Sequence, residues 1–334
     1  MLYMTTRDDV NLSTAHKALV TVNPPDGGEY VPYRFPQYTP QDIKQLENKS
    51  FFQTVEEILG QFFSLRLDNG PLISDYPVFY KTLEMSHRAV IAELWQNRTG
   101  TYKEFESHVI KQLATNAGAE ICASEWPQIA LRIAVFFALY GEMLRCERID
   151  QDQTIDISVW NDDFVTPIAA LYCRKMGLPI NMIICTCGSD NDIWDFIHKG
   201  TVNTTMLSDL QRNGLERLIH MTLGMEESRS FANCCSGNKT YTVDEEKLSI
   251  MNMGLFCVVA GKGRSGQVIN SLFRMNTYIA DNHTALAYGG LQDYRAKLGG
   301  SGSALRMSYD SPQHCLQDIS AATGLDENTI RTFL

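Results

Sequence analysis

A lysine near the start of a helix-like segment is the residue best suited to covalent chemistry. Lys103 precedes apolar residues at helical spacing. A lysine amine attacks carbonyl carbons when burial or a neighbouring cation lowers its pKa. The structural alternative is a solvated ammonium, or an aliphatic stem that packs in a groove. The residue types alone leave both interpretations open.

Two adjacent carboxylates form a second candidate site. Asp162 and Asp163 stand between a strand-like and a helix-like segment, and Glu125 could join them if the fold brings it close. Such a group could bind a cation or transfer protons. The alternative, a solvated turn at a helix entry, is the interpretation we favour. Because the chain lacks His-Glu-x-x-His spacing and a Cys/His cluster, we expect no metal site of the zinc type.

A third candidate is the glycine-rich segment Gly261–Gly266, Gly-Lys-Gly-Arg-Ser-Gly. Its spacing matches loops that bind dinucleotide phosphates, and Lys262 and Arg264 would suit an anion. However, the acidic residue expected about twenty positions later, at the end of a second strand, is missing. We therefore favour a turn in which Ser265 caps the next helix.

Composition excludes several functional classes. The chain has 334 residues, 44% of them hydrophobic, and a net charge of −10, which argues against nucleic-acid binding. Nine cysteines without Cys-x-x-Cys spacing favour a reduced, cytoplasmic protein. Residues 1–10 lack the apolar core of a signal peptide. The most apolar stretch, 129–144, contains Arg132 and is short for a membrane span, so we expect a buried helix.

The candidate residues must be positioned by an α/β fold. Strand-like segments at 154–160 and 181–186 alternate with helical patterns at 167–176 and 192–198, which is typical of a parallel sheet. Earlier segments predict helices at 40–48, entered from Thr39, and at 52–63, 101–113 and 127–144, with a short strand at 90–95. Later segments predict helices at 266–275, 284–296, 312–322 and 326–333, and a strand at 304–309.

Six segments, in the same order, resemble threonine synthase, a fold-type II pyridoxal-phosphate enzyme. The most specific is 93–105, Glu-Leu-Trp-Gln-Asn-Arg-Thr-Gly-Thr-Tyr-Lys-Glu-Phe, which is similar to the family's Glu-Leu-Phe-His-Gly-Pro-Thr-x-Ala-Phe-Lys-Asp-Phe. The others are 25–32 (Pro-Asp-Gly-Gly-Glu-Tyr-Val-Pro), 126–140, 158–193, 213–219 and 279–286 (Ile-Ala-Asp-Asn-His-Thr-Ala-Leu).

The resemblance implies the parallel-sheet large domain of the tryptophan synthase β-like architecture. We expect a threonine synthase-like N-terminal segment at 1–72, a rudimentary small domain with connecting helices at 73–153, and an α/β large domain at 154–334. His283 falls in the last similar segment, which in this family is mainly a helix entry, so we expect a structural role for it.

The resemblance also implies roles for individual residues. Lys103 matches the lysine that forms a Schiff base with pyridoxal phosphate. Asn161 and Phe164 fall in the loop that holds the cofactor phosphate, and Ser308 matches the hydroxyl that meets the pyridine nitrogen. Glu125 and Gln128 align with the asparagine and arginine that hold the substrate phosphate.

Several of these positions depart from the family pattern. Asp162 and Asp163 replace a glycine and an asparagine in the phosphate loop, and two carboxylates repel a dianion. Gln128 cannot replace the bidentate fork of arginine, and Glu125 has the wrong charge. Residues 105–125 are too short to form the small domain that binds the substrate carboxylate. This deletion predicts an uncovered apolar surface that could bind a partner or form a homodimer.

Three functional hypotheses follow. The first is a protein without threonine synthase activity that binds a small amino-acid-like ligand or a protein partner. The second is an enzyme with a changed reaction that still uses Lys103. The third is a pyridoxal-phosphate-dependent lyase of amino-acid biosynthesis. An enclosed pocket of polar groups around Lys103 would favour the second hypothesis over the first. An open shelf around Lys103 would favour the first hypothesis.

Overall fold

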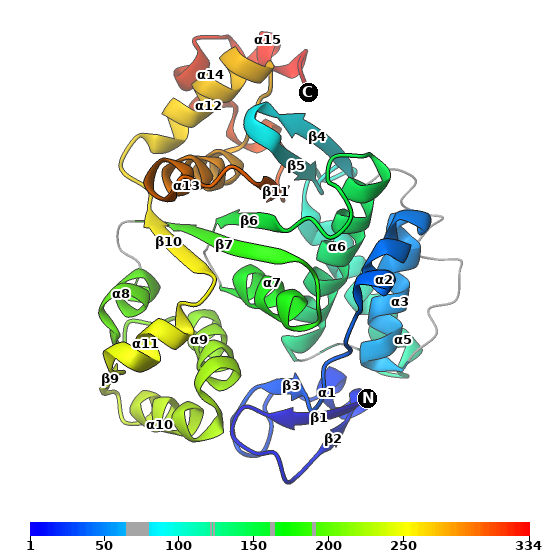
Figure 1. Cartoon of the computed structure of the whole chain (residues 1–334), viewed down its shortest axis with the longest axis vertical. Coiled ribbons are helices and arrows are strands. Elements are labelled where there is room, and N and C mark those ends of the chain that lie inside the picture. Colours follow the sequence, from blue (N-terminus) through cyan, green and yellow to red (C-terminus); the bar gives the residue numbers. More distant parts are fainter. Residues whose placement is uncertain (65–79, 121, 123, 161–163, 189–191) are drawn as a thin grey trace.

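The computed structural model describes residues 1–64, 80–120, 122, 124–160, 164–188 and 192–334. Its central feature is a six-stranded sheet in the order β10-β7-β6-β11-β5-β4 (Figure 1). Neighbouring strands are parallel except β4 and β5. The predicted α/β fold with a mostly parallel sheet is therefore confirmed. The strands are β4 Lys81–Met85, β5 Ala89–Glu93, β6 Ile155–Trp160, β7 Ile180–Cys187, β10 Leu255–Val259 and β11 Ser303–Ser308.

Strand β11 lies in the middle of the sheet, between β5 and β6, and its side chains alternate between two apolar cores. Leu305 and Met307 belong to one core and Ala304 to the other. Because alternate residues of a strand share a face, Arg306 lies on the same face as Ala304. A charged residue thus stands in the centre of an otherwise apolar sheet.

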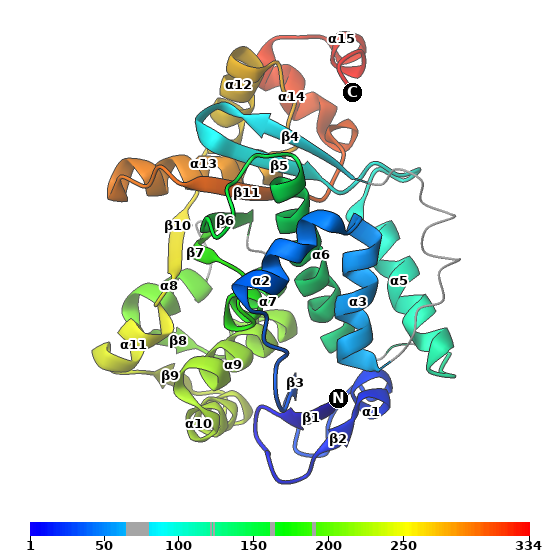
Figure 2. The same ribbon diagram turned by 45° about the vertical axis from the view of Figure 1, so that its right-hand side comes forward.

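Helices cover both faces of the sheet, as the two views in Figures 1 and 2 show. One face packs against α3 Phe51–Phe63, α6 Trp126–Arg145 and α7 Val165–Lys175, with α5 Tyr102–Asn116 beside them. The other packs against α12 Arg264–Asn276, α13 Asn282–Leu298 and α14 Leu316–Thr323. By length and composition α6 could cross a membrane, but 83% of its most apolar window is buried, as the sequence predicted for this stretch.

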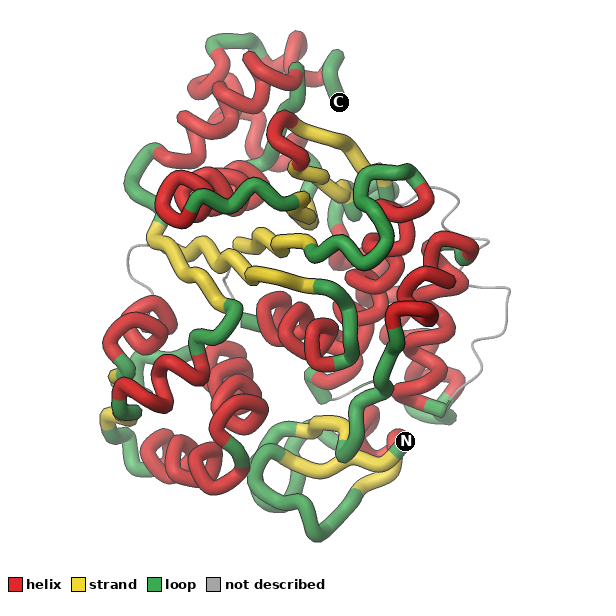
Figure 3. Tube along the Cα trace, viewed as in Figure 1, coloured by secondary structure: helices red, strands yellow, loops and turns green. Residues whose placement is uncertain are grey.

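Two smaller units flank the sheet (Figure 3). The N-terminal one is an antiparallel sheet of β1 Leu2–Thr5, β2 Ser13–Thr14 and β3 Tyr30–Pro32. Helix α1 Ala15–Val20 lies between β2 and β3 in the sequence, and α2 Pro40–Lys44 follows β3. Thr39 caps α2, as predicted, through a capping box with Asp42. The second unit, inserted between β7 and β10, contains α8 Asp192–Lys199, β8 Thr201–Asn203, α9 Asp209–Leu223, α10 Met225–Ser236, β9 Thr240–Thr242 and α11 Glu245–Met251.

The structure differs from the sequence-based expectations in two places. The main sheet extends across the expected boundary between 153 and 154, because β5 pairs with β11 of the later part and β4 pairs with β5. Ser265 does not cap α12: Gly263 precedes that helix with a φ of 77°, and the Ser265 hydroxyl donates to Asn282 Oδ1. The described residues of 105–125 include no large hydrophobic side chain that is exposed, and the uncovered partner-binding surface that the deletion implies stays a prediction.

Candidate functional site

A polar cleft of about 430 Å³ lies where β6 and β11 end and where α5 and α7 begin. In open α/β sheets, ligands bind beyond the carboxyl ends of the parallel strands, so this is the expected position for a site. The lining residues come from α5, α6, α7, α13 and the ends of the two strands: Tyr102, Lys103, Glu106, Gln128, Arg132, Trp160, Thr166, His283, Arg306, Tyr309 and Asp310.

Arg132 projects from α6 into the cleft, where its position is determined by several contacts. Its Nη1 donates to Thr166 Oγ1 at 2.8 Å, and its Nη2 lies 3.3 Å from Glu106 Oε2. The guanidinium carbon is 5.6 Å from the Tyr102 ring centroid and 5.3 Å from that of Tyr309. Ion pairing and contacts with aromatic rings together hold this arginine in one orientation. Its charge is balanced by Glu106.

The two tyrosines of the cleft are neutral hydrogen-bonding groups. Burial raises the pKa of both Tyr102 and Tyr309, so their phenols stay protonated at neutral pH. Tyr309 OH lies 3.3 Å from Thr166 Oγ1. Trp160 stacks on His283 with ring centroids 5.5 Å apart and an interplanar angle of 6°. These rings provide flat apolar walls beside the charged groups.

Arg306 is the most buried cation of the cleft, with 1% of its surface exposed. Among the described residues, its Nε and Nη1 have no hydrogen-bond partner. Burial lowers the pKa of Arg306, and the carboxylates of Asp281 and Asp310 act in the opposite direction. Burial also raises the pKa of Asp310, and Asp281 raises it further.

The structure brings two of the predicted residues, Lys103 and Gln128, into this cleft. The Lys103 side chain is exposed, so its amine is not desolvated in the way that would activate a nucleophile. Polar groups converge around it, but Lys103 itself lies at the open side of the cleft. Gln128 contributes an uncharged amide where the resemblance implied an arginine.

Ser308 lies near the cleft but its hydroxyl is already hydrogen-bonded. It accepts from Trp95 Nε1 at 3.0 Å and from Thr284 Oγ1 at 2.8 Å, and it donates to Asp281 Oδ2 at 3.2 Å. It is buried and does not line the cleft. The Ser308 hydroxyl is therefore not free to donate to a pyridine nitrogen or to accept from a protonated one.

Glu125 does not line the cleft. It precedes α6, and its carboxylate pairs with the buried Arg217 of α9. The predicted grouping of Glu125 with Asp162 and Asp163 stays a prediction, because Asn161, Asp162 and Asp163 lie outside the described residues. In the described part of the chain, no three His, Cys, Asp or Glu side chains are grouped to hold a metal ion.

Phe164 has a structural position. It is buried and adopts a left-handed conformation, with a φ of 59°, directly before α7. A Cβ added to Gly214 would lie 2.9 Å from Phe164 Cβ, so the ring packs closely against α9. Phe164 thus packs the start of α7 against α9, and α7 carries Thr166 to the cleft.

The described residues do not fit pyridoxal phosphate in the orientation that the resemblance implies. Lys103 could reach an aldehyde in the cleft, but the Ser308 hydroxyl is enclosed by its own hydrogen bonds. Its carboxylate neighbour, Asp281, also accepts from the backbone N–H groups of His283 and Thr284. The ring-nitrogen contact would therefore require this network to be broken.

The glycine-rich segment 261–266 borders a separate cavity of about 820 Å³ at the start of α12. Arg264 does not point its charge to a ligand there, because its Nη2 donates to Asp293 Oδ1 at 2.6 Å. Asp318 adds a negative charge to the lining. These groups give no support to phosphate binding at this segment.

Several cleft residues were not predicted to be functional. Arg132 was noted only because it interrupts an apolar helix, and Arg306 interrupts an apolar strand in the same way. Such interruptions are the signal that could have identified them, since a buried charge requires a partner. His283, expected to be structural, lines the cleft beside Trp160.

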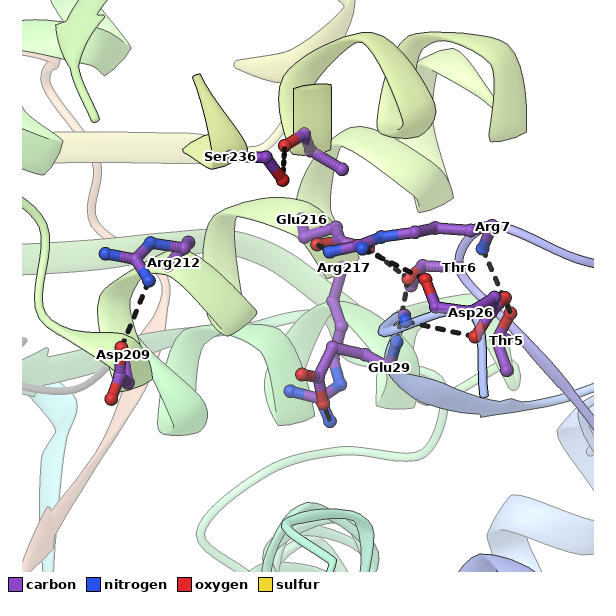
Figure 4. Close-up of polar contacts among 12 residues, drawn as sticks. Thr5, Thr6, Arg7, Asp26, Glu29, Asp209, Arg212, Glu216, Arg217 and Ser236 are labelled. Carbon is purple, nitrogen blue, oxygen red and sulfur yellow. Dashed lines mark hydrogen bonds and ion pairs between the residues drawn. The ribbon is translucent and has the colours of Figure 1, made fainter. Parts of the chain in front are cut away.

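A network of buried ion pairs joins the N-terminal unit to α9 (Figure 4). Arg7 binds Glu216 with Nε at 2.8 Å and Nη2 at 2.7 Å, a bidentate pair. Arg217 donates to Glu29 Oε2 at 2.5 Å. Thr6 Oγ1 donates to Glu216 and accepts from the backbone N–H of Glu29. The N-terminal unit is thereby held against the side of α9.

Comparison with known proteins supports the resemblance. Residues 2–72 match the family model described as the threonine synthase N terminus. "Threonine synthase-like 1" of Homo sapiens is 20% identical over 174 residues, 48% of this chain, and that of Mus musculus is 22% identical over 177 residues, also 48%. The chain covers only 23% of the length of each of these relatives.

The fold is that of threonine synthases. The pyridoxal-phosphate-bound threonine synthase from Brucella melitensis superposes with a TM-score of 0.81, covering 98% of this chain and 92% of that chain at 15% identity. The threonine synthase from yeast superposes with a TM-score of 0.79, covering 97% and 90% at 14% identity. The predicted resemblance to threonine synthases is confirmed, and so is the fold class.

Proposed function

We propose that this threonine synthase-like protein binds a small amino-acid-like ligand in the polar cleft and does not perform the threonine synthase reaction. The observation that supports this proposal most directly is the pairing of Glu125 with Arg217, outside the cleft. Glu125 stands where the resemblance implies a contact to the substrate phosphate. A carboxylate bound to a buried arginine is costly to release, so this position cannot turn towards a phosphate.

The charges of the cleft suit a ligand that carries both signs. Lys103 and Arg306 offer positive charge to a carboxylate, and Asp310 offers negative charge to an ammonium group. The stacked rings of Trp160 and His283 form an apolar wall for a short side chain. An amino acid or a close analogue has this combination of groups in a volume that a cleft of about 430 Å³ can hold.

A lyase that depends on pyridoxal phosphate is the second candidate, and Lys103 is the observation that favours it. This residue matches the cofactor lysine of the family and lines the cleft. Three features argue against the lyase: the exposed Lys103 side chain, the enclosed Ser308 hydroxyl and the uncharged Gln128. An enzyme with a different reaction at Lys103 would also need an activated amine. We therefore place binding ahead of catalysis, and we expect the protein to act in the cytoplasm.

Two assays with purified protein test this proposal. We expect no threonine from O-phosphohomoserine in the presence of pyridoxal phosphate. We also expect no visible absorption band from lysine-bound pyridoxal phosphate, with Lys103→Ala as the control for any unspecific signal. Turnover of O-phosphohomoserine that disappears in Lys103→Ala would overturn the proposal. A band that disappears in this variant without turnover would instead redirect the search to other amino-acid substrates.

A further inference from the structure

Arg306 is a buried cation with two guanidinium nitrogens, Nε and Nη1, that have no hydrogen-bond partner among the described residues. Its side chain comes from the middle of β11 and lines the cleft, although the residue is only 1% exposed. In the described part of the chain, no acceptor lies within hydrogen-bonding distance of its Nε and Nη1. Because an arginine keeps its charge in proteins, this arrangement is unfavourable unless another molecule supplies the missing acceptors.

The neighbouring carboxylates do not satisfy these donors. Asp281 already accepts from the backbone N–H groups of His283 and Thr284 and from the Ser308 hydroxyl. Asp310 lies close enough to interact electrostatically with Arg306, but it does not accept from Nε or Nη1. Both carboxylates lie close enough to stabilise the positive charge of Arg306, but neither accepts a hydrogen bond from its Nε or Nη1.

Among the described residues that line the cleft, the Lys and Arg side chains outnumber the carboxylates. Arg132 is paired with Glu106 at 3.3 Å and bonded to Thr166, so its charge is balanced locally. Lys103 and Arg306 remain, with Asp310 as their carboxylate in the described lining and Asp281 acting on Arg306 from outside it. An anionic ligand would restore the balance.

We propose that the cleft binds its ligand through an oxyanion group, a carboxylate or a phosphate, held by the Arg306 guanidinium. The unpaired Nε and Nη1 lie on two different edges of the planar guanidinium, and each can donate a charge-assisted hydrogen bond to an oxygen of such a group. Lys103 contributes a second positive charge at the open side. This anchor rests on the proposed binding function and names the ligand group that the cleft selects. It lies on β11, whereas the resemblance implied the phosphate contacts at positions 125 and 128.

Isothermal titration calorimetry at low ionic strength tests the anchor with two probes, inorganic phosphate and acetate. We expect the wild-type protein to bind at least one of them, and the tighter probe identifies the ligand group. Arg306→Met should weaken that binding at least about tenfold, because it removes charge-assisted hydrogen bonds. Arg306→Lys keeps the positive charge but not the guanidinium group, so its affinity for the anion should lie between that of the wild type and that of Arg306→Met. Arg274→Met is the matched control, since Arg274 is an exposed arginine of α12 that does not line the cleft.

The stability of the ligand-free protein separates a binding role from a structural one. Replacing an unpaired buried charge with an apolar side chain should raise the Tm of Arg306→Met above that of the wild type when no anion is present. The anion-induced rise in Tm should disappear in this variant. A lower Tm, or a variant that does not fold, would mean that the guanidinium stabilises the protein and would overturn the proposal. Wild-type protein that binds neither probe, or Arg306→Met that binds as wild type does, would overturn it too.

These outcomes are distinct from those that test the proposed function. Threonine formation that depends on Lys103 would refute the proposed function whatever Arg306 does. Unchanged anion binding by Arg306→Met would refute the anchor while leaving the absence of threonine synthase activity intact.

Discussion

The carboxylate of Glu125, at the entry of α6, accepts a hydrogen bond from the guanidinium of Arg217, in the middle of α9. Arg217 also binds Glu29 of the N-terminal unit, and only 1% of its side chain is exposed. One buried arginine thus joins three parts of the chain that are distant in sequence. The contact removes Glu125 from the cleft and uses it to hold the fold together.

Arg217→Met should therefore destabilise the protein strongly. The substitution leaves the partly buried carboxylates of Glu29 and Glu125 without their cation, and breaking such a pair costs about 3–5 kcal/mol. Urea unfolding followed by circular dichroism measures this loss. The matched control is Arg212→Met on the same helix, where the partner Asp209 is exposed. We expect that control to change the free energy of unfolding by about 0.5 kcal/mol or less, because exposed ion pairs contribute little. Equal effects of the two substitutions would contradict the structural role of Arg217.

The secondary structure could be predicted better than the site. Strands β6, β7 and β11 and helices α3, α6 and α7 follow from apolar spacing, because each buries one face or both in the cores beside the main sheet. In the second unit, between β7 and β10, the sequence analysis predicted only the helix at 192–198, which is α8. Helices α10 and α11 are mostly polar and bury few side chains, so apolar residues indicate them less clearly than they indicate α7.

The cleft itself depends on contacts that no local pattern contains. Nothing near Glu125 indicates that Arg217 will bind it, and nothing near Ser308 indicates that Thr284 and Asp281 will occupy its hydroxyl. Lys103 and Gln128, which the family resemblance singled out, both line the cleft, because each lies near the start of a helix next to the sheet edge. Arg306 was not predicted, because none of the six similar segments contains it.

The pH dependence of stability provides a test of Glu29. Burial raises the pKa of this carboxyl to about 7, although Arg217 acts in the opposite direction. Since the pKa in the folded protein is above that of the unfolded chain, the folded state binds the proton more tightly. This contribution to stability is fully present below about pH 4.5 and is lost as the pH rises through 7. From pH 5 to pH 8, we expect wild-type protein to lose up to about 3 kcal/mol relative to Glu29→Gln, which cannot ionise.

Urea titrations of both proteins at several pH values between 5 and 8 measure this difference. Glu57→Gln is a suitable control, because Glu57 is a solvent-exposed carboxylate that pairs only with Lys49 on the surface. Its pH profile should be parallel to that of the wild type. If Glu29→Gln also follows the wild-type profile, Glu29 ionises normally in the folded protein and the buried network is more hydrated than the structure indicates.

Close packing of α13 on the sheet gives a prediction that is independent of charge. A Cβ added to Gly290 would lie 1.9 Å from Thr186 Oγ1 and 3.1 Å from Val258 Cγ1, so α13 could not keep its distance from β7 and β10. Gly290→Ala should cost about 1–3 kcal/mol of stability through overpacking, despite the higher helix propensity of alanine.

The control is Gly266→Ala in α12, where the nearest atom to the new Cβ is Ala322 Cβ at 3.7 Å. That substitution should be neutral or stabilise the protein by up to about 1 kcal/mol, because alanine favours a helix more than glycine does. Thermal unfolding of the two variants distinguishes these effects, and a Gly290→Ala protein as stable as Gly266→Ala would show that α13 is not packed against β7 at this position.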